Sequence, residues 1–210
     1  MVTTTELLAR LRAERLMPII RSERQEDAAA IGRALLEAGC TVLEVSLTTP
    51  GALDVIAELR EFAPGLIGAG TVLTASDVAS ARDAGAEFMV TPAVTESIDA
   101  SVRLDIPVLA GALTPTEILA AHGAGASAVK LFPAELGGPA YFSALRAPLP
   151  HIPLIPVGGV TLEMGRDYLA RGALALGVGS PLTGRASDPV DPAVIAERAT
   201  AFQRMVAEAR

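Results

Sequence analysis

Eight short apolar segments, rich in Val, Ile and Leu, alternate along the chain with longer stretches rich in alanine. The stretches between them, such as residues 25–39 and 73–86, carry apolar residues at helical spacing and a glycine near their end. The pattern therefore predicts eight strands, each followed by a helix. The predicted strands cover residues 16–21, 41–47, 66–72, 88–93, 107–113, 128–133, 154–160 and 173–180.

Strands that are apolar along their whole length and alternate with helices indicate a parallel sheet covered by those helices. Eight such units in 210 residues fit an α/β fold of the (β/α)8 TIM-barrel class, and a doubly wound open sheet is the alternative. Residues 1–15 predict an additional amphipathic N-terminal helix with Leu7, Leu8 and Leu11 on one stripe. Residues 184–193 read as a loop before a last helix over 194–210. We expect one barrel domain spanning residues 1–210.

Composition narrows the class of protein. The net charge of −7 argues against sequence-independent nucleic-acid binding, which needs a basic surface. No apolar run approaches the roughly 18 residues of a membrane span, and the N-terminus lacks a signal-peptide core. The single cysteine, Cys40, has no partner for an internal disulfide and reads as a small buried filler. These features predict a cytoplasmic protein with neither nucleic acid nor membrane as partner.

Several predicted strands carry a polar residue toward the carboxyl end, where the chemistry of barrel enzymes takes place. In residues 41–47, strand alternation separates Glu44 from an apolar face formed by Leu43, Val45 and Leu47. The same alternation separates Lys130 from its apolar neighbours. We therefore expect Glu44 and Lys130 to point into the barrel. The polar strand residues are Arg21, Glu44, Thr71, Thr91 and Lys130.

Lys130 is the only lysine in the chain, whereas arginine occurs sixteen times. A structural ion pair with Glu44, or a lysine whose amine reaches solvent from a strand end, would explain it without chemistry. Arginine serves charge pairing better than lysine, however, and it does not become a neutral nucleophile. Burial favours the neutral amine of lysine, which attacks carbonyl groups. The pattern indicates Schiff-base chemistry with Glu44 as the acid–base group.

The seventh and eighth predicted strands end in the glycine-rich sequences VGGVT (157–161) and GVGS (177–180). Glycines let backbone N–H groups approach a phosphate closely, and the loops after strands 7 and 8 are the usual phosphate site of barrels. Either sequence alone is a weak signal, since glycines at strand ends also form plain turns. Together they predict a phosphate site that includes Gly158, Gly159, Gly179 and Ser180.

The ordered set LEVSL, GAGTVL, VTPA, VKLFPAE, PVGGVT and GVGS, between about residues 15 and 185, resembles the 2-keto-3-deoxy-6-phosphogluconate (KDPG) aldolase family. The family includes aldolases for the galactonate epimer (KDPGal) and for 4-hydroxy-2-oxoglutarate. The resemblance implies a class I aldolase that releases pyruvate and glyceraldehyde 3-phosphate from a phosphorylated 2-keto acid. It also implies a homotrimer without metal or organic cofactor.

The resemblance also implies roles for individual residues. By position, Lys130 matches the Schiff-base lysine, Glu44 the catalytic glutamate and Thr71 the threonine near the pyruvyl carboxylate. Pro92 and Phe132 match positions that line the pocket. The residues that match phosphate-loop positions are Gly158, Gly159 and Ser180, beside Gly179.

One position departs from the family pattern. An arginine that commonly follows the glutamate by four residues is replaced by Thr48. We expect Arg21, at the end of the neighbouring first strand, to lie beside Thr48 and Glu44 and to hold the substrate carboxylate. The galactonate branch is similar in both respects, so the sugar epimer stays open.

Other functions fit parts of the pattern. A phosphosugar isomerase or epimerase on the same barrel would use Glu44 as an enolising base and would need no buried amine. A non-catalytic module that binds a phosphorylated metabolite would need Lys130 and Glu44 only as an ion pair. A metal-dependent aldolase is disfavoured, because His122 and His151 lack ligand spacing and read as surface residues.

Overall fold

Eight parallel strands alternate with helices in the computed structural model, which describes residues 2–62 and 64–209. The strands are β1 (Leu16–Ile20), β2 (Val42–Ser46), β3 (Leu66–Gly70), β4 (Met89–Val90), β5 (Val108–Ala112), β6 (Ala128–Leu131), β7 (Leu154–Pro156) and β8 (Leu176–Val178). The helices are α1 (Thr4–Glu14), α2 (Gln25–Glu37), α3 (Ala52–Phe62), α4 (Ala75–Asp83), α5 (Glu96–Arg103), α6 (Pro115–Gly123), α7 (Gly138–Arg146), α8 (Leu162–Ala170), α9 (Ser180–Thr183) and α10 (Pro192–Glu208), with a 3-10 turn η1 (Ala134–Leu136). None of these helices is both long and apolar enough to cross a membrane within the described ranges.

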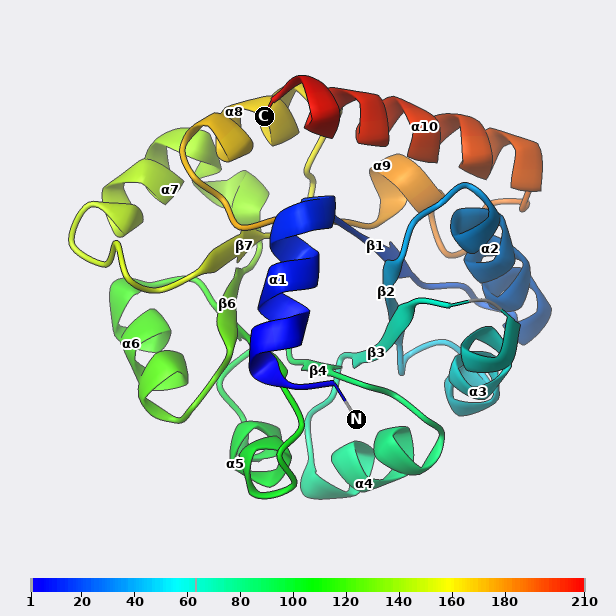
Figure 1. The fold of residues 1–210 in the computed structure, drawn as a ribbon, viewed down its shortest axis with the longest axis horizontal. Helices are drawn as coiled ribbons and strands as arrows, with labels where there is room; N and C mark the ends of the chain where they lie inside the picture. Colours follow the sequence, from blue (N-terminus) through cyan, green and yellow to red (C-terminus); the bar gives the residue numbers. More distant parts are fainter. Residues whose placement is uncertain (1, 63, 210) are drawn as a thin grey trace.

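The strands follow one another in spatial order and nearly close into a barrel, with the helices around it (Figure 1). β1 pairs with β2 on one side and with β8 on the other, where Leu16 lies opposite Leu176. Between β7 and β8 the described residues form no longer ladder, but Val157 and Gly177 form a bridge and the N–H of Leu174 donates to the carbonyl of Leu154 in β7. A doubly wound sheet would reverse its strand order near the middle, so this alternative is wrong and the predicted barrel is confirmed.

Several strands are shorter than the apolar pattern predicts. The predicted strand over 88–93 is reduced to β4, because the Thr91 hydroxyl donates to the carbonyl of Ala93 and turns the chain. β7 ends before Gly158 and Gly159, whose positive φ angles are incompatible with a strand.

At the C-terminal end of the chain, α10 begins two residues earlier than predicted. Asp191 caps it by accepting a hydrogen bond from the N–H of Ala193. Arg210, the last residue of the predicted helix, lies outside the described residues.

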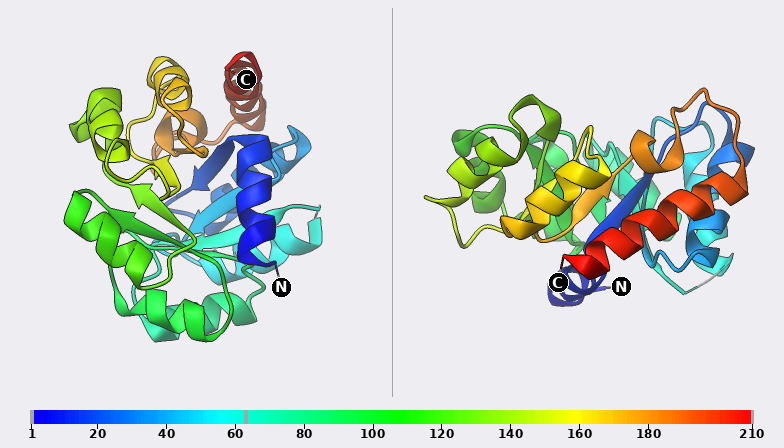
Figure 2. Two further views of the ribbon diagram at one scale, coloured as in Figure 1. Left: turned by 60° about the vertical axis from the view of Figure 1, so that its left-hand side comes forward. Right: turned by 90° about the horizontal axis from the view of Figure 1, so that it is seen from above.

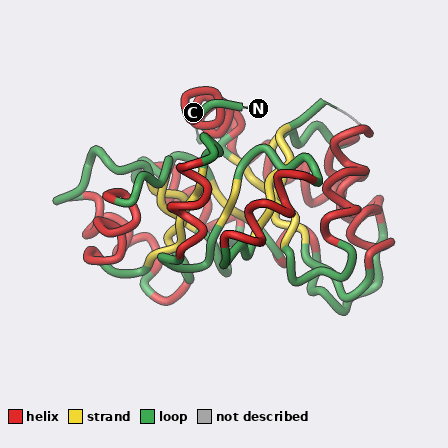
Figure 3. The backbone as a smooth tube through the Cα atoms, turned by 90° about the horizontal axis from the view of Figure 1, so that it is seen from below, coloured by secondary structure: helices red, strands yellow, loops and turns green. Residues whose placement is uncertain are grey.

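Strand alternation divides the apolar side chains into two layers. Leu43 and Val45 belong to the cluster between the strands and the surrounding helices, whereas Val42 belongs to the cluster inside the barrel. The interior cluster that contains Val42 also includes Met17, Phe88, Leu109 and Ile155. In Figure 3 the strands form the central layer of the molecule. The predicted inward direction of Glu44, which shares a face with Val42, is therefore confirmed.

Helix α1 lies across the end of the barrel at which the strands begin (Figures 1 and 2). Its first turn is fixed by reciprocal hydrogen bonds between Thr3 and Glu6. Leu7 and Leu11 are fully buried against the interior cluster, and Leu8 is half-buried at its edge. Burial of each leucine contributes about 1.5–3 kcal/mol, which accounts for the docking of α1. The opposite end, where the strands finish, is left for the site.

Candidate active site

Lys130 and Glu44 face each other inside the barrel. Lys130 lies on β6 and Glu44 on β2, and Nζ of Lys130 is 3.5 Å from Oε1 of Glu44. Glu44 is fully buried, and neither of its carboxylate oxygens has a hydrogen-bond partner. A buried carboxylate without hydrogen bonds is unfavourable unless a charge compensates it. The amine of Lys130 supplies that charge and leaves both oxygens free to exchange a proton.

Two glycines on β3 make room inside the barrel, Gly70 for Glu44 and Gly68 for Phe88. Gly68 lies opposite Glu44 and Gly70 opposite Ser46 in the register of β2 and β3. A Cβ atom on Gly70 would clash with the Glu44 carboxylate, and one on Gly68 would clash with the ring of Phe88. Sequence reasoning missed both residues, although glycine at two successive inward positions of a predicted strand is a signal of close approach.

A chain of three hydroxyl groups lies at the ends of β2 and β3. Oγ of Ser46 is 2.9 Å from Oγ1 of Thr48 and 2.9 Å from Oγ1 of Thr71. Thr71 adopts φ 60°, a left-handed conformation that β-branched residues rarely take and that costs about 1–3 kcal/mol. The surroundings hold Thr71 in this strained geometry beside the face that carries Glu44. Ser46, which joins the two threonines, was not among the predicted site residues.

Phe132, after β6, lies beside Lys130, whereas Pro92, after β4, packs against the backbone of β5. The centroid of the Phe132 ring is 5.4 Å from Nζ of Lys130, within range of a cation–π contact. Pro92 follows β4, and its backbone lies so close to Gly111 that a Cβ atom on Gly111 would clash with it. Thr91, by contrast, uses its hydroxyl within the fold: it donates to Ala93 and accepts from the N–H of Gly111.

A cavity of about 190 Å³ opens beside Lys130 at the carboxyl ends of the strands. It contains six of the residues singled out from the sequence. Glu44 lies deeper, behind the amine, and neither Thr71 nor Pro92 lines this cavity. The six residues are Lys130, Arg21, Gly158, Gly159, Gly179 and Ser180.

The glycine-rich turn after β7 packs tightly against the chain that follows Lys130. Gly158 and Gly159 adopt φ 101° and 67°, which only glycine takes readily. A Cβ on Gly159 would clash with the side chain of Glu135. The N–H of Glu135 donates to the carbonyl of Gly158 at 3.2 Å. This turn therefore requires glycine for its backbone as well as for any ligand.

Two arginines, Arg21 and Arg185, line the same cavity. The N–H of Glu23 donates to the carbonyl of Ala186 at 3.0 Å, which ties the chain after β1 to the loop that carries Arg185. No hydrogen bond or ion pair joins Arg21 to Thr48 or Glu44 in the described part of the chain. Arg21 thus lines a cavity together with the glycine-rich turns, while the N–H of the next residue, Ser22, donates to Oγ1 of Thr49 at 3.2 Å; the predicted role of Arg21 beside Thr48 stays a prediction. Arg185 lies in the loop predicted over residues 184–193, and no sequence pattern marked it as a site residue.

Other reactive side chains lie apart from this cavity. Burial, followed by the nearby charge of Glu14, raises the pKa of the Cys40 thiol from 9.0 to about 12, as expected of an inert filler. His122 and His151 are exposed and lie edge to face, with ring centroids 5.7 Å apart. No group of three or more His, Cys, Asp or Glu residues that could hold a metal occurs within residues 2–62 and 64–209.

Residues 7–191 match a protein-family model described as KDPG and KHG aldolase. The 2-dehydro-3-deoxy-phosphogluconate aldolase of Pseudomonas aeruginosa is 42% identical over 162 residues, which cover 76% of this chain and 74% of the relative. A probable 2-dehydro-3-deoxy-6-phosphogalactonate aldolase of Rhizobium meliloti is 40% identical over 174 residues, covering 80% of this chain and 81% of the relative. The two relatives are almost equally similar to this chain, so the comparison does not distinguish the gluconate substrate from its galactonate epimer.

Solved structures agree with these relatives. The KDPG aldolase of Zymomonas mobilis with 3-phosphoglycerate has a TM-score of 0.86 at 30% identity and covers 96% of both chains. The KDPG aldolase of Legionella pneumophila, with pyruvate captured as a covalent carbinolamine intermediate, has a TM-score of 0.79 at 29% identity. That comparison covers 94% of this chain and 95% of the other.

Proposed function

Since the chain belongs to the KDPG and KHG aldolase family and is therefore a lyase, we propose that it cleaves 2-keto-3-deoxy-6-phosphogluconate, or its galactonate epimer, into pyruvate and glyceraldehyde 3-phosphate. The observation that carries this proposal is the buried pair of Lys130 and Glu44, with 3.5 Å between amine and carboxylate. A single amine in a closed apolar interior, next to a carboxylate without other partners, suits imine chemistry.

The proposed reaction begins when the neutral amine of Lys130 attacks the C2 carbonyl of the substrate. Glu44, holding the proton it has taken from the Lys130 ammonium, protonates the departing hydroxyl of the carbinolamine, so that water leaves. The nitrogen lone pair then forms a protonated imine that withdraws electrons from C3. Glu44 takes the proton of the C4 hydroxyl, the C3–C4 bond breaks, and its electron pair moves toward the imine to give an enamine. The aldehyde leaves. The protonated Glu44 then returns a proton to C3, and water hydrolyses the imine to release pyruvate and the free amine.

We assign the pyruvyl carboxylate to the hydroxyl chain of Thr48, Ser46 and Thr71. The chain lies on the barrel face that carries Glu44, and its end hydroxyls can direct an O–H toward an anion. Thr48 lacks the charge of the usual family arginine, so the site holds the carboxylate by hydrogen bonds from neutral groups. The strained backbone of Thr71 fixes one of these donors in place.

We assign the phosphate to the cavity beside Lys130. The turn at Gly158 and Gly159 and the hydroxyl of Ser180 offer uncharged donors, and Arg21 and Arg185 add charge. Guanidinium groups bind phosphate oxygens in pairs of hydrogen bonds, which are stronger than neutral ones. We therefore expect phosphorylated substrates to be preferred over 4-hydroxy-2-oxoglutarate. A comparison of kcat/KM on the two phosphorylated epimers and on 4-hydroxy-2-oxoglutarate would decide the substrate.

The direct test of the proposed chemistry is reduction with borohydride in the presence of pyruvate. We expect one adduct, in the peptide that contains Lys130, and no adduct when pyruvate is left out. A protein whose mass does not change would favour the isomerase or the binding module. An adduct confined to the N-terminal amine would likewise overturn the assignment of Lys130.

A further inference from the structure

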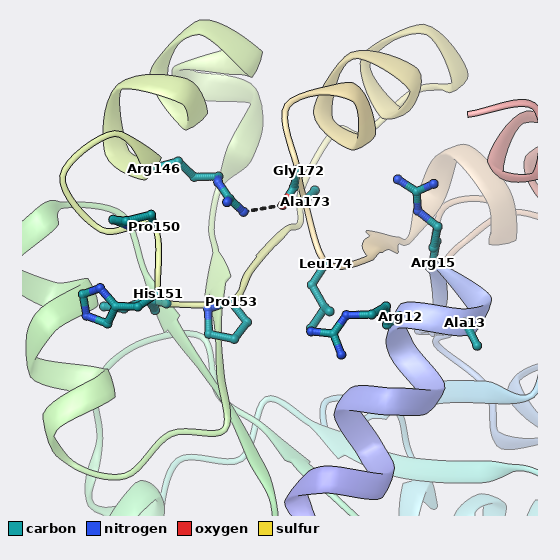
Figure 4. Close-up of a pocket in the computed structure, with 11 residues that line it drawn as sticks. Arg12, Ala13, Arg15, Arg146, Pro150, His151, Pro153, Gly172, Ala173 and Leu174 are labelled. Atoms are coloured by element: carbon teal, nitrogen blue, oxygen red, sulfur yellow. Dashed lines mark hydrogen bonds between the residues drawn. The ribbon is translucent and has the colours of Figure 1, made fainter. Parts of the chain in front are cut away.

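A second, larger cavity lies at the opposite end of the barrel, where the strands begin. Its volume is about 620 Å³, within the range of small-molecule sites. The end of α1, the connection from α7 to β7 and the connection from α8 to β8 surround it (Figure 4). None of the residues assigned to the aldolase site lines it, so whatever it binds does not rest on the proposed function.

The charged and titratable side chains that line this cavity are all basic. Arg12, Arg15, Arg146 and His151 line it, whereas no aspartate or glutamate does among its described lining residues. Arg12 and Arg146 extend from opposite sides, from α1 and from the last turn of α7 (Figure 4). The protein carries a net charge of −7. The basic character of this cavity is therefore opposite in sign to the net charge of the protein.

Among the residues that the structure describes, no aspartate or glutamate forms an ion pair with these arginines. Arg146 donates to the carbonyl of Gly172, and Arg15 donates to the carbonyls of Ala209 at 2.9 Å and Leu169 at 3.5 Å. The guanidinium group of Arg12 makes no hydrogen bond or ion pair with any residue of the described ranges. No ion pair in those ranges involves the three guanidinium groups, each of which has five N–H donors. Most of their donors are therefore left for a ligand.

The simplest alternative is that these arginines only complete helix ends. Arg12 and Arg146 lie in the last turns of α1 and α7, where a positive charge is favourable. Arg103 has the same place in the last turn of α5 and is not one of the residues that line this cavity, so a place at a helix end does not by itself bring an arginine to it. Gathering three like charges around one hollow is unfavourable, and a bound anion would relieve it.

We propose that this cavity binds a compact polyanion, with two or more phosphate or carboxylate groups that Arg12 and Arg146 grip from opposite sides. Guanidinium groups recognise both kinds of oxygen acceptor in the same paired geometry. The ligand would contact the end of α1, the helix that closes the barrel. Binding would therefore stabilise the folded protein in proportion to occupancy.

Calorimetric titration of the full chain with pyrophosphate, and separately with citrate, tests the site and distinguishes the two chemistries. Arg12→Gln/Arg146→Gln should weaken binding of the effective probe by at least about tenfold, the value of one charge-assisted hydrogen bond. Arg103→Gln is the matched control and should bind like the wild type. Arg21→Gln/Arg185→Gln should also keep this binding, because it removes charge only from the cavity beside Lys130.

The proposal is wrong if neither probe binds saturably below about 10 mM, or if the Arg12/Arg146 double variant binds as the wild type does. It is equally wrong if binding disappears in Arg21→Gln/Arg185→Gln instead. Arg12→Gln alone removes no hydrogen bond or ion pair among the described residues and should still weaken binding, which separates loss of the ligand from loss of the structure. Unchanged borohydride trapping with pyruvate in that variant would show that the barrel is intact.

Discussion

Nζ of Lys130 lies 3.5 Å from Oε1 of Glu44, and both groups are buried. A structural ion pair and a catalytic pair share this geometry, so variants that keep the charges but change the chemistry separate them. Lys130→Arg retains a cation opposite Glu44 but lacks a nucleophilic amine. We expect it to lose cleavage of the phosphorylated keto acid and trapping by borohydride, while its melting temperature stays close to that of the wild type. Residual cleavage at a wild-type rate would contradict a Schiff base on Lys130.

Glu44→Gln keeps the shape of the side chain and removes its basicity. We expect kcat to fall by about 10²–10⁴, the usual contribution of a general acid–base group. Glu58→Gln is a suitable control, because Glu58 lies on the surface in an exposed pair with Arg33. Unchanged turnover in Glu44→Gln would move proton transfer to another group or to water.

Arg21→Gln/Arg185→Gln removes both guanidinium groups from the cavity beside Lys130. Each lost charge-assisted hydrogen bond is worth about 1.5–3 kcal/mol, so kcat/KM for a phosphorylated substrate should fall by about tenfold or more. Trapping of pyruvate, which has no phosphate, should stay near the wild-type rate. Equal losses in both assays would instead assign these arginines to the carboxylate, as the sequence predicts for Arg21.

Gly159→Ala tests the turn that holds the proposed phosphate site. The new Cβ would clash with Glu135 and would occupy a backbone conformation with φ 67°, so the turn must shift. We expect KM for the phosphorylated substrate to rise more than KM for 4-hydroxy-2-oxoglutarate. Glu135→Gly in the same protein removes the clashing side chain, Cβ included, and should recover part of the loss. Equal effects on both substrates would mean that the turn serves only the fold.

The thiol of Cys40 should resist modification in the native protein. Burial raises its pKa from 9.0 to about 12, so at pH 8 only about one molecule in 10⁴ carries the reactive thiolate. The raised pKa also contributes stability that is complete below pH 9 and is lost as the pH rises toward 12. Titration with a disulfide reagent at pH 8 should show no fast reaction until denaturant is added. Immediate reaction of the native protein would contradict this environment.

The sequence by itself determined the barrel and the direction of its key side chains. Continuous apolar segments that alternate with helices allow few arrangements other than a parallel barrel, and strand alternation places Glu44 and Lys130 on inward faces. The helix over the N-terminal end of the barrel also followed from its stripe of leucines. These inferences succeeded because each depends on residues close together in the chain. The roles of the individual site residues stay predictions.

Only the tertiary structure decided which side chains share a cavity. Arg21 meets Arg185 because the chain after β1 bonds to a loop more than 160 residues later, through Glu23 and Ala186. No local pattern predicts the path of such a loop, since its conformation depends on distant contacts. The cavity that brings Arg12 to Arg146 has the same origin, because it forms where helix ends from remote parts of the chain converge. Periodicity reports the face on which a residue lies, and only the packing of the whole barrel determines its neighbours.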